Sequence, residues 1–148
     1  MPRIRVRVKI KKKQDEVYEL LKKMEEFPGF MKNIKSLKII KHLEENKIVT
    51  AWEAEIEGAL LCWKEEDCFD DLIREIRFSM LEGNYKGYRG RWLVESAESG
   101  CRLTLEADFD WGIPMLEKYV GGALEEKARH GLLGMAQAVK SKIENIYV

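Results

Sequence analysis

The 148-residue sequence is poor in the residues that build metal centres and disulfide frameworks. It contains two histidines and three cysteines, which are Cys62, Cys68 and Cys101. An odd number of cysteines without a C-x-x-C pair fits neither a paired zinc site nor a set of disulfides. We therefore expect reduced thiols, a cytoplasmic protein, no bound metal and no cofactor.

An excess of one charge and long apolar runs are also lacking. The 26 basic residues balance 26 acidic ones, so the formal net charge is zero. Without a global field of one sign, DNA is not an expected partner. No apolar run approaches the roughly 20 residues of a membrane-spanning helix, so we expect no stable membrane insertion. The length predicts a single domain over residues 1–148 that can bury a real core.

The residues that are present predict seven strands. In residues 3–10, apolar side chains alternate with basic ones, a period of two with one wet face. More such segments follow between turn signals, which is typical of an antiparallel meander rather than of alternating strands and helices. The six further predicted strands cover residues 34–43, 47–56, 59–69, 72–82, 87–95 and 102–111.

Helical periodicity flanks the meander on both sides. We expect Asp15 to cap a short helix that Pro28-Gly29 ends. After Pro114, apolar residues step by three and four over about thirty residues, so a helix of roughly 45 Å can lie across the sheet. The predicted fold is α+β, with a seven-stranded curved antiparallel sheet, two short helices and a long C-terminal helix.

Hairpin register predicts which side chains share the inner face of the sheet. A two-residue turn at Glu57-Gly58 places Trp52 opposite Trp63, and directly opposite residues share a face. Such an aromatic face must point inward. It is either a packed core or a cavity whose aromatic residues orient a guest, and we expect the cavity. The candidate cavity residues are Trp52, Trp63, Phe78, Met80, Tyr88, Trp92, Leu105, Phe109, Leu124 and Met135.

A second two-residue turn, at Asp70-Asp71, would place Asp67 opposite Arg74 and Trp63 opposite Phe78. We therefore expect an Asp67–Arg74 ion pair on the inner face, with Glu65 beside it. Such a group could anchor the polar head of a ligand. The alternative is a salt bridge at the rim, exposed to water and contributing little to stability.

Three segments resemble the START-like, helix-grip superfamily and, within it, the polyketide cyclase/dehydrase and coenzyme Q-binding group. They are Phe27–Ile34 after Val17-Tyr18, Trp63–Asp67, and Glu82–Tyr85 followed by Gly90-Arg91-Trp92. The resemblance covers nearly the whole chain and implies a cavity between the sheet and the C-terminal helix. In such proteins the cavity holds a lipid, an isoprenoid quinone or a polyketide-like aromatic molecule.

The expected function is therefore binding or transport of a hydrophobic small molecule. The first alternative is a polyketide cyclase/aromatase-type enzyme. Enzymes of that kind carry a tyrosine after the proline turn and an arginine past the tryptophan-containing segment, where this sequence has Ile34 and Asp67. The only candidates for proton transfer would then be Tyr88, Arg74, Glu65 and Asp67.

The second alternative is a ribosome- or protein-association module, which predicts a tightly filled interior. The basic residues of the first strand keep contact with RNA open as an interpretation. A solvated outer face explains the same residues. They are Arg3, Arg5, Arg7 and Lys9.

Overall fold

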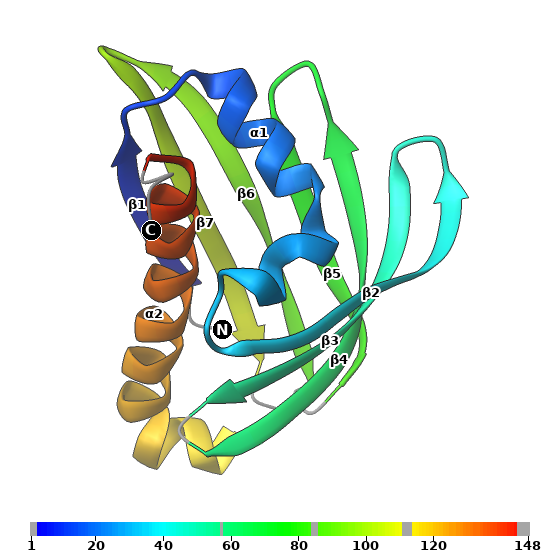
Figure 1. The fold of residues 1–148 in the computed structure, drawn as a ribbon. Helices are drawn as coiled ribbons and strands as arrows, with labels where there is room; N and C mark the ends of the chain where they lie inside the picture. The colour runs from blue at the N-terminus through cyan, green and yellow to red at the C-terminus, as the bar shows by residue number, and fades with distance from the viewer. Residues whose placement is uncertain (1–2, 57, 84–85, 111–113, 145–148) are drawn as a thin grey trace.

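A computed structural model describes residues 3–56, 58–83, 86–110 and 114–144, and shows a curved sheet with helices on one face (Figure 1). This architecture confirms the predicted α+β fold. The elements in chain order are β1 (Arg3–Ile10), α1 (Gln14–Lys22), the 3₁₀ helix η1 (Met24–Gly29), β2 (Ile34–Glu44), β3 (Lys47–Ile56), β4 (Ala59–Asp70), β5 (Glu75–Gly83), β6 (Gly87–Ala97), β7 (Gly100–Asp110) and α2 (Pro114–Glu144).

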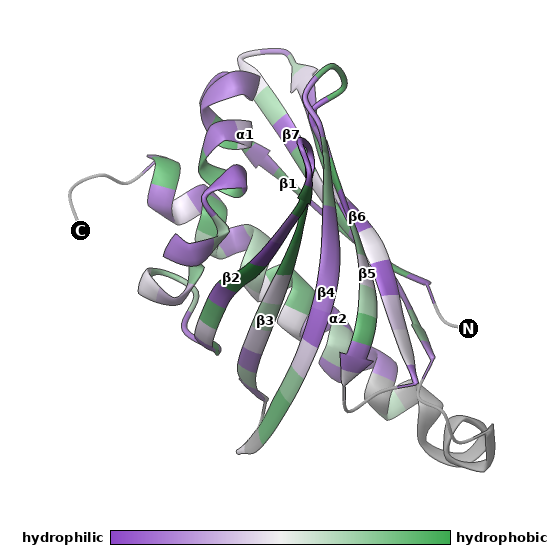
Figure 2. Ribbon diagram, turned by 90° about the vertical axis from the view of Figure 1, so that its right-hand side faces the viewer, coloured by the Kyte–Doolittle hydropathy of each residue, from purple (hydrophilic) through white to green (hydrophobic). Residues whose placement is uncertain are grey.

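The sheet has the strand order β1-β7-β6-β5-β4-β3-β2, and every neighbouring pair is antiparallel. Strands β2 to β7 form the predicted meander. The first strand leaves this sequence order and pairs with the last one, so β1 and β2 form the two edges. Seen from the side, the sheet makes one layer, and α1 and α2 make the other (Figure 2).

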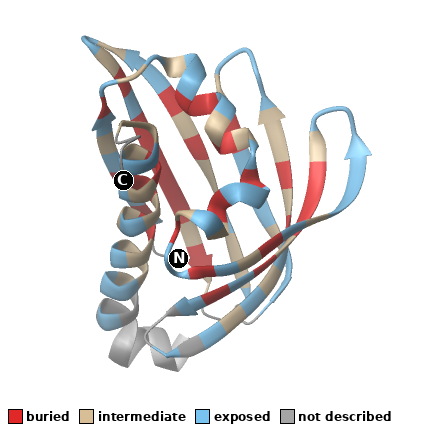
Figure 3. Cartoon of the chain, in the orientation of Figure 1, coloured by how far each residue is buried: buried red, intermediate tan, exposed pale blue. Residues whose placement is uncertain are grey.

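The alternating pattern of the strands separates a dry face from a wet one. In β7, Leu103, Leu105 and Ala107 are buried under the helices, and Asp108 points to the outer face. In β1, Ile4 and Val6 are buried while Arg3, Arg5 and Arg7 are exposed. Figure 3 shows where the buried positions lie along the strands; most are apolar residues of the inner face, and Glu75, Thr104 and Glu106 are buried on the outer face.

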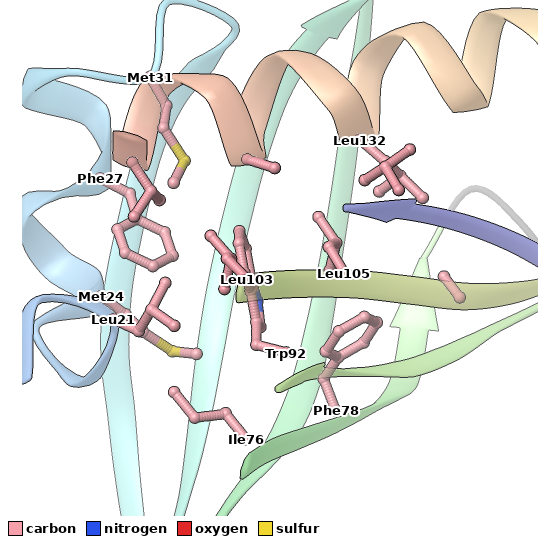
Figure 4. Close-up of a cluster of buried hydrophobic side chains, with 14 of the residues drawn as sticks. Leu21, Met24, Phe27, Met31, Ile76, Phe78, Trp92, Leu103, Leu105 and Leu132 are labelled. Carbon is pink, nitrogen blue, oxygen red and sulfur yellow. The ribbon is translucent and has the colours of Figure 1, made fainter. Parts of the chain in front are cut away.

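One hydrophobic core lies between the sheet and the helices, and it contains side chains from α1, η1 and α2 (Figure 4). Phe27 of η1 is fully buried, and its ring centroid lies 6.0 Å from those of Trp52 and Trp92. Among the described side chains of α2, those of Leu132, Ala136 and Val139 are buried. This helix packs against β1 and β7, near one side of the concave face.

The start of α1 differs from the prediction. Lys13 is the N-cap residue and makes no side-chain cap hydrogen bond, whereas Asp15 lies in the first helical turn. The Asp15 carboxylate instead accepts a hydrogen bond from Arg74 Nε at 2.6 Å, which explains why it does not cap the helix. Pro28 does not end α1, because α1 ends at Lys22 and the proline lies inside η1.

The β4–β5 turn was predicted with the wrong length. It contains four residues, Asp71 to Arg74, and β5 begins at Glu75. Asp70 Oδ1 accepts the backbone N–H groups of Leu72 and Ile73 at 3.1 and 3.4 Å, and Arg74 has φ 57°. These features build a wider turn than the sequence signal Asp70-Asp71 indicated.

The consequence is a shifted pairing between β4 and β5. Asp67 lies opposite Phe78, and Trp63 lies opposite Gly83. For Asp67 the offset from the predicted pairing is four residues, and a bulge between Lys64 and Glu65 makes it five at Trp63. The inner face of β4 is set instead by its regular pairing with β3. The other predicted pairing is confirmed, because Trp52 lies opposite Trp63. Within the described ranges, no helix has the length and apolar character that crossing a bilayer requires.

Candidate functional site

A cavity of about 70 Å³ lies on the concave face beneath α2. Its wall is almost entirely apolar and comes from β2, β3, β4, β6, β7 and α2, together with the residue before β2. The lining residues are Asn33, Ile34, Ala54, Leu61, Trp63, Tyr88, Phe109, Ala128, Gly131, Leu132 and Met135.

Four of the predicted cavity residues line this space: Trp63, Tyr88, Phe109 and Met135. Four others are buried in the hydrophobic core outside the cavity wall: Trp52, Phe78, Trp92 and Leu105. Met80 is half-buried opposite Glu65, away from the lining, and the side chain of Leu124 lies outside the described part of the chain.

Several lining residues were missed by reasoning from the sequence. Hairpin register already placed Ala54 and Leu61 on the inner face, so alternation carried their signal. Asn33 and Ile34 lie where the chain enters β2, and no periodic pattern marks their direction. Gly131 has no side chain that a hydrophobic stripe could include, and its neighbour Leu132 was assigned only to that stripe.

The aromatic side chains run as a continuous strip from the core to the cavity. Trp52 and Trp63 stack with ring centroids 5.2 Å apart and an interplanar angle of 16°. Tyr88 lies 4.9 Å from the ring centroids of both Phe78 and Phe109. These packed rings fill much of the space between sheet and helices. The remaining volume is small beside the roughly 300–1,000 Å³ of a typical ligand pocket.

Two acidic residues are buried next to this strip. Glu65 is 2% exposed and Asp67 is 0% exposed. The Trp63 Nε1–H group donates to Glu65 Oε1 at 2.8 Å, and the Thr50 hydroxyl donates to Asp67 Oδ2 at 2.6 Å. Trp52 Nε1–H donates in turn to Thr50 Oγ1 at 2.8 Å. The two stacked indoles therefore end in one polar network on the inner face.

The predicted Asp67–Arg74 ion pair is wrong, because the four-residue turn carries Arg74 out of the inner face to Asp15. Among the described residues, no lysine, arginine or histidine forms an ion pair with Glu65 or Asp67. The predicted anchor is thus an acid pair without the arginine.

Burial controls the protonation of this pair. It raises the pKa of Glu65 well above its usual range, helped by the negative charge of Asp67, and it also raises the pKa of Asp67. Asp67 Oδ1 accepts no hydrogen bond from any N–H or hydroxyl group. The two carboxyl groups lie within hydrogen-bonding reach of each other, so a proton on one of them can be shared with the other.

The outer face of the sheet carries a separate set of paired charges. Arg3 binds Asp108 at 2.9 Å, and Arg5 binds Glu106 at 2.6 Å. Arg91 bridges Glu106 and the buried Glu75 at 2.7 Å each. The basic character of the first strand is therefore partly neutralised by acids of the neighbouring strands, as in a solvated outer face.

Comparison with solved structures shows the same fold in other proteins. TTHA0849 of Thermus thermophilus superimposes with a TM-score of 0.91 at 22% identity, over 99% of this chain and 100% of that one. The Zhui aromatase/cyclase of a Streptomyces species gives a TM-score of 0.80 at 14% identity, over 99% and 98%. A START superfamily protein from Mycobacterium smegmatis gives 0.83 at 14% identity, over 97% and 98%.

Sequence comparison assigns the family. No curated protein has significant sequence similarity to the chain. Residues 10–136 match the family model described as polyketide cyclase/dehydrase and lipid transport. This match spans most of the sequence and agrees with the resemblance noted from its motifs, so the chain belongs to the polyketide cyclase/dehydrase and lipid transport family.

Proposed function

We propose that the protein binds a hydrophobic small molecule in the cavity beneath α2 and acts as a carrier rather than as an enzyme. The observation that carries this proposal is the lining itself: among its described residues, aromatic and aliphatic side chains surround the space and Asn33 is the one amide. A lining of this kind suits an apolar guest with few polar groups. A lipid, an isoprenoid quinone such as coenzyme Q, or a polyketide-like aromatic has that chemistry.

The size of the cavity sets a condition on this function. At about 70 Å³ it is far smaller than the roughly 300–1,000 Å³ of a typical ligand pocket. A guest of lipid or quinone size must therefore widen it. Gly131 of α2 lines the cavity, and a methyl group built at its Cα meets no atom within 4 Å.

The first experiment is native mass spectrometry of the purified protein, followed by extraction of whatever copurifies. A discrete adduct of lipid or quinone mass supports a carrier and identifies the class of its ligand. Binding of the uncharged dye N-phenyl-1-naphthylamine then locates the site. Gly131→Leu fills the cavity and should abolish dye binding.

Gly134→Leu is the matched control, because Gly134 lies one turn further along α2, is exposed and also has open space around it. The control variant should bind the dye as the wild type does. Equal dye binding by both variants would show that the dye occupies some other place, and the proposal for this cavity would fail.

A cyclase-type enzyme is the second candidate, supported by Tyr88, the one ionisable side chain among the described lining residues. The enzyme would use its phenol as the proton donor or acceptor. Turnover of an aromatic polyketide surrogate that is lost in Tyr88→Phe would favour the enzyme. Dye binding by a wild-type protein that does not turn over the surrogate favours the carrier.

The thiols and the surface charges bear on the compartment of the protein and on its possible association with ribosomes. Cys68 and Cys101 are free thiols, which supports a reducing, cytoplasmic compartment. An association with ribosomes is less well supported, since Arg3 and Arg5 are already paired with acids on the outer face. Co-sedimentation with ribosomal subunits tests that alternative.

A further inference from the structure

Trp63 connects the cavity to the buried acid pair. Its ring forms part of the cavity wall, and its Nε1–H group donates to Glu65 at 2.8 Å. The same ring stacks on Trp52, whose Nε1–H group reaches Asp67 through the Thr50 hydroxyl. The position of this part of the wall therefore depends on the geometry of the two carboxyls.

None of the described side chains that lie opposite the pair carries a positive charge, so a proton is what can neutralise a carboxylate there. From β3, Thr50 faces Glu65, and from β5, Met80 and Phe78 lie opposite Glu65 and Asp67. Glu66 of the same strand points to the outer face and adds a further negative charge that acts on Asp67.

Without the shared proton, two carboxylates would face each other in a medium of low dielectric constant. Like charges on two neighbouring side chains repel strongly when both are buried, as Glu65 and Asp67 are. The side chains relieve this repulsion by separating. Glu65 is hydrogen-bonded to the half-buried Trp63, so its movement toward water takes away the contact that fixes the indole.

We propose that the Glu65–Asp67 pair is a proton-controlled latch on the cavity, closed while the two carboxyls share a proton and opened when that proton is lost. Opening releases Trp63 from the wall and widens the cavity, so a guest larger than 70 Å³ binds better above the transition than below it. This regulation rests on the proposed function, because it acts on the same cavity.

The test compares two readouts in the same protein between pH 5 and pH 10. Assigned ¹⁵N-indole NMR signals report the Trp63 hydrogen bond, and N-phenyl-1-naphthylamine titrations report the affinity of the cavity. We expect the Trp63 signal to shift in a single step as the pH rises. Over the same interval the affinity for the dye should increase at least about fivefold, the lower range of typical coupling between two sites.

Glu65→Gln is the decisive variant, because its amide can donate to Asp67 as the protonated acid does and cannot lose that proton. It should stay closed, with neither the indole step nor the gain in affinity. Asp67→Asn removes the repulsion from the other side and should also suppress both changes, which keeps the test sound if one variant folds poorly. Glu66→Gln, with its side chain on the outer face, should retain both changes.

The outcomes separate the two proposals. An indole step that persists in Glu65→Gln, or no step in the wild type, overturns the latch. A step that disappears in Glu65→Gln without any change in dye affinity overturns its control of the cavity. Failure of the dye to bind at every pH, with the step intact and dependent on Glu65, overturns the proposed carrier function and leaves the movement of Trp63 established.

Discussion

Arg74 is a turn residue rather than a ligand anchor. It has φ 57° and donates to Asp15, whose side chain is 73% exposed. Arg74→Met should therefore leave the affinity for N-phenyl-1-naphthylamine unchanged within about twofold. Because exposed ion pairs contribute little, the free energy of unfolding should fall by less than about 1 kcal/mol. Dye titration and urea unfolding measure the two effects. A tenfold loss of affinity would show that Arg74 contributes to ligand binding after all.

Glu65 should make folding stability depend on pH. Its pKa is raised in the folded protein, so the folded state binds more protons than the unfolded state. The free energy of unfolding must then fall as the pH rises above the ordinary glutamate value of 4.5 and through the raised pKa. Urea unfolding at pH 5, 6, 7 and 8 should show this decline in the wild type and a flatter profile in Glu65→Gln.

Glu66→Gln controls for the loss of a carboxylate on the same strand. Its profile should follow that of the wild type, since the Glu66 side chain lies on the outer face near Lys47. A profile in Glu65→Gln as steep as the wild-type one would show that another group binds the proton.

The outer face of the sheet is held by a ladder of charges across four strands. Arg91 is its central member, because it binds both Glu75, which is 2% exposed, and Glu106. Arg91→Met leaves these glutamates with only Arg77 and Arg5, and should lower the free energy of unfolding by about 2 kcal/mol. Arg3→Met is the matched control: its side chain is 60% exposed, so we expect a clearly smaller loss.

Thermal and urea unfolding distinguish the two arginine variants. Burial favours the protonated form of Glu106, but its hydrogen bonds to Arg5 and Arg91 outweigh this effect and lower its pKa. The stabilisation should therefore be present above the ordinary glutamate pKa and be lost as the pH falls through the lowered one. Equal stability of Arg91→Met and Arg3→Met at pH 7 would contradict the role of the ladder.

Strand faces were predictable from the sequence, and turn lengths were not. Alternation alone assigned Trp63, Glu65 and Asp67 to the inner face, and the regular pairing of β4 with β3 keeps them there. The β3–β4 turn followed its glycine, which has φ 83°. The β4–β5 turn depends on Asp70 accepting two backbone N–H groups and on Arg74 taking a left-handed conformation. Neither feature could be predicted from the residue types in the turn.

The two-layer arrangement depends on Phe27, which joins η1 to the middle of the sheet. It is fully buried and contacts the rings of both Trp52 and Trp92. Phe27→Ala should lower the free energy of unfolding by about 3–5 kcal/mol. Phe30, three residues on, is half-buried, so Phe30→Ala should lower it by clearly less; urea unfolding of the two variants checks this, and equal losses would contradict it.

The volume of the cavity is a property of the whole molecule that the sequence could not supply. A packed core and a core with a cavity have the same pattern of apolar residues along the strands, so the pattern does not distinguish between them. Which of the two forms depends on how closely α2 and η1 approach the sheet, and that distance reflects all the packed side chains together. The aromatic residues therefore divide, with Trp52 and Trp92 in the core and Trp63 and Tyr88 at the cavity.

The pairing of β1 with β7 has a consequence for biosynthesis. Arg5 and Glu106, which face each other across these strands, are 101 positions apart in the chain. The ribosome therefore delivers β1 first and its only partner strand last, and Ile4 and Val6 stay uncovered until residue 100 and those after it have left the exit tunnel. The meander of β2 to β7 can form by local hairpins during translation, but the molecule closes only near the end of synthesis.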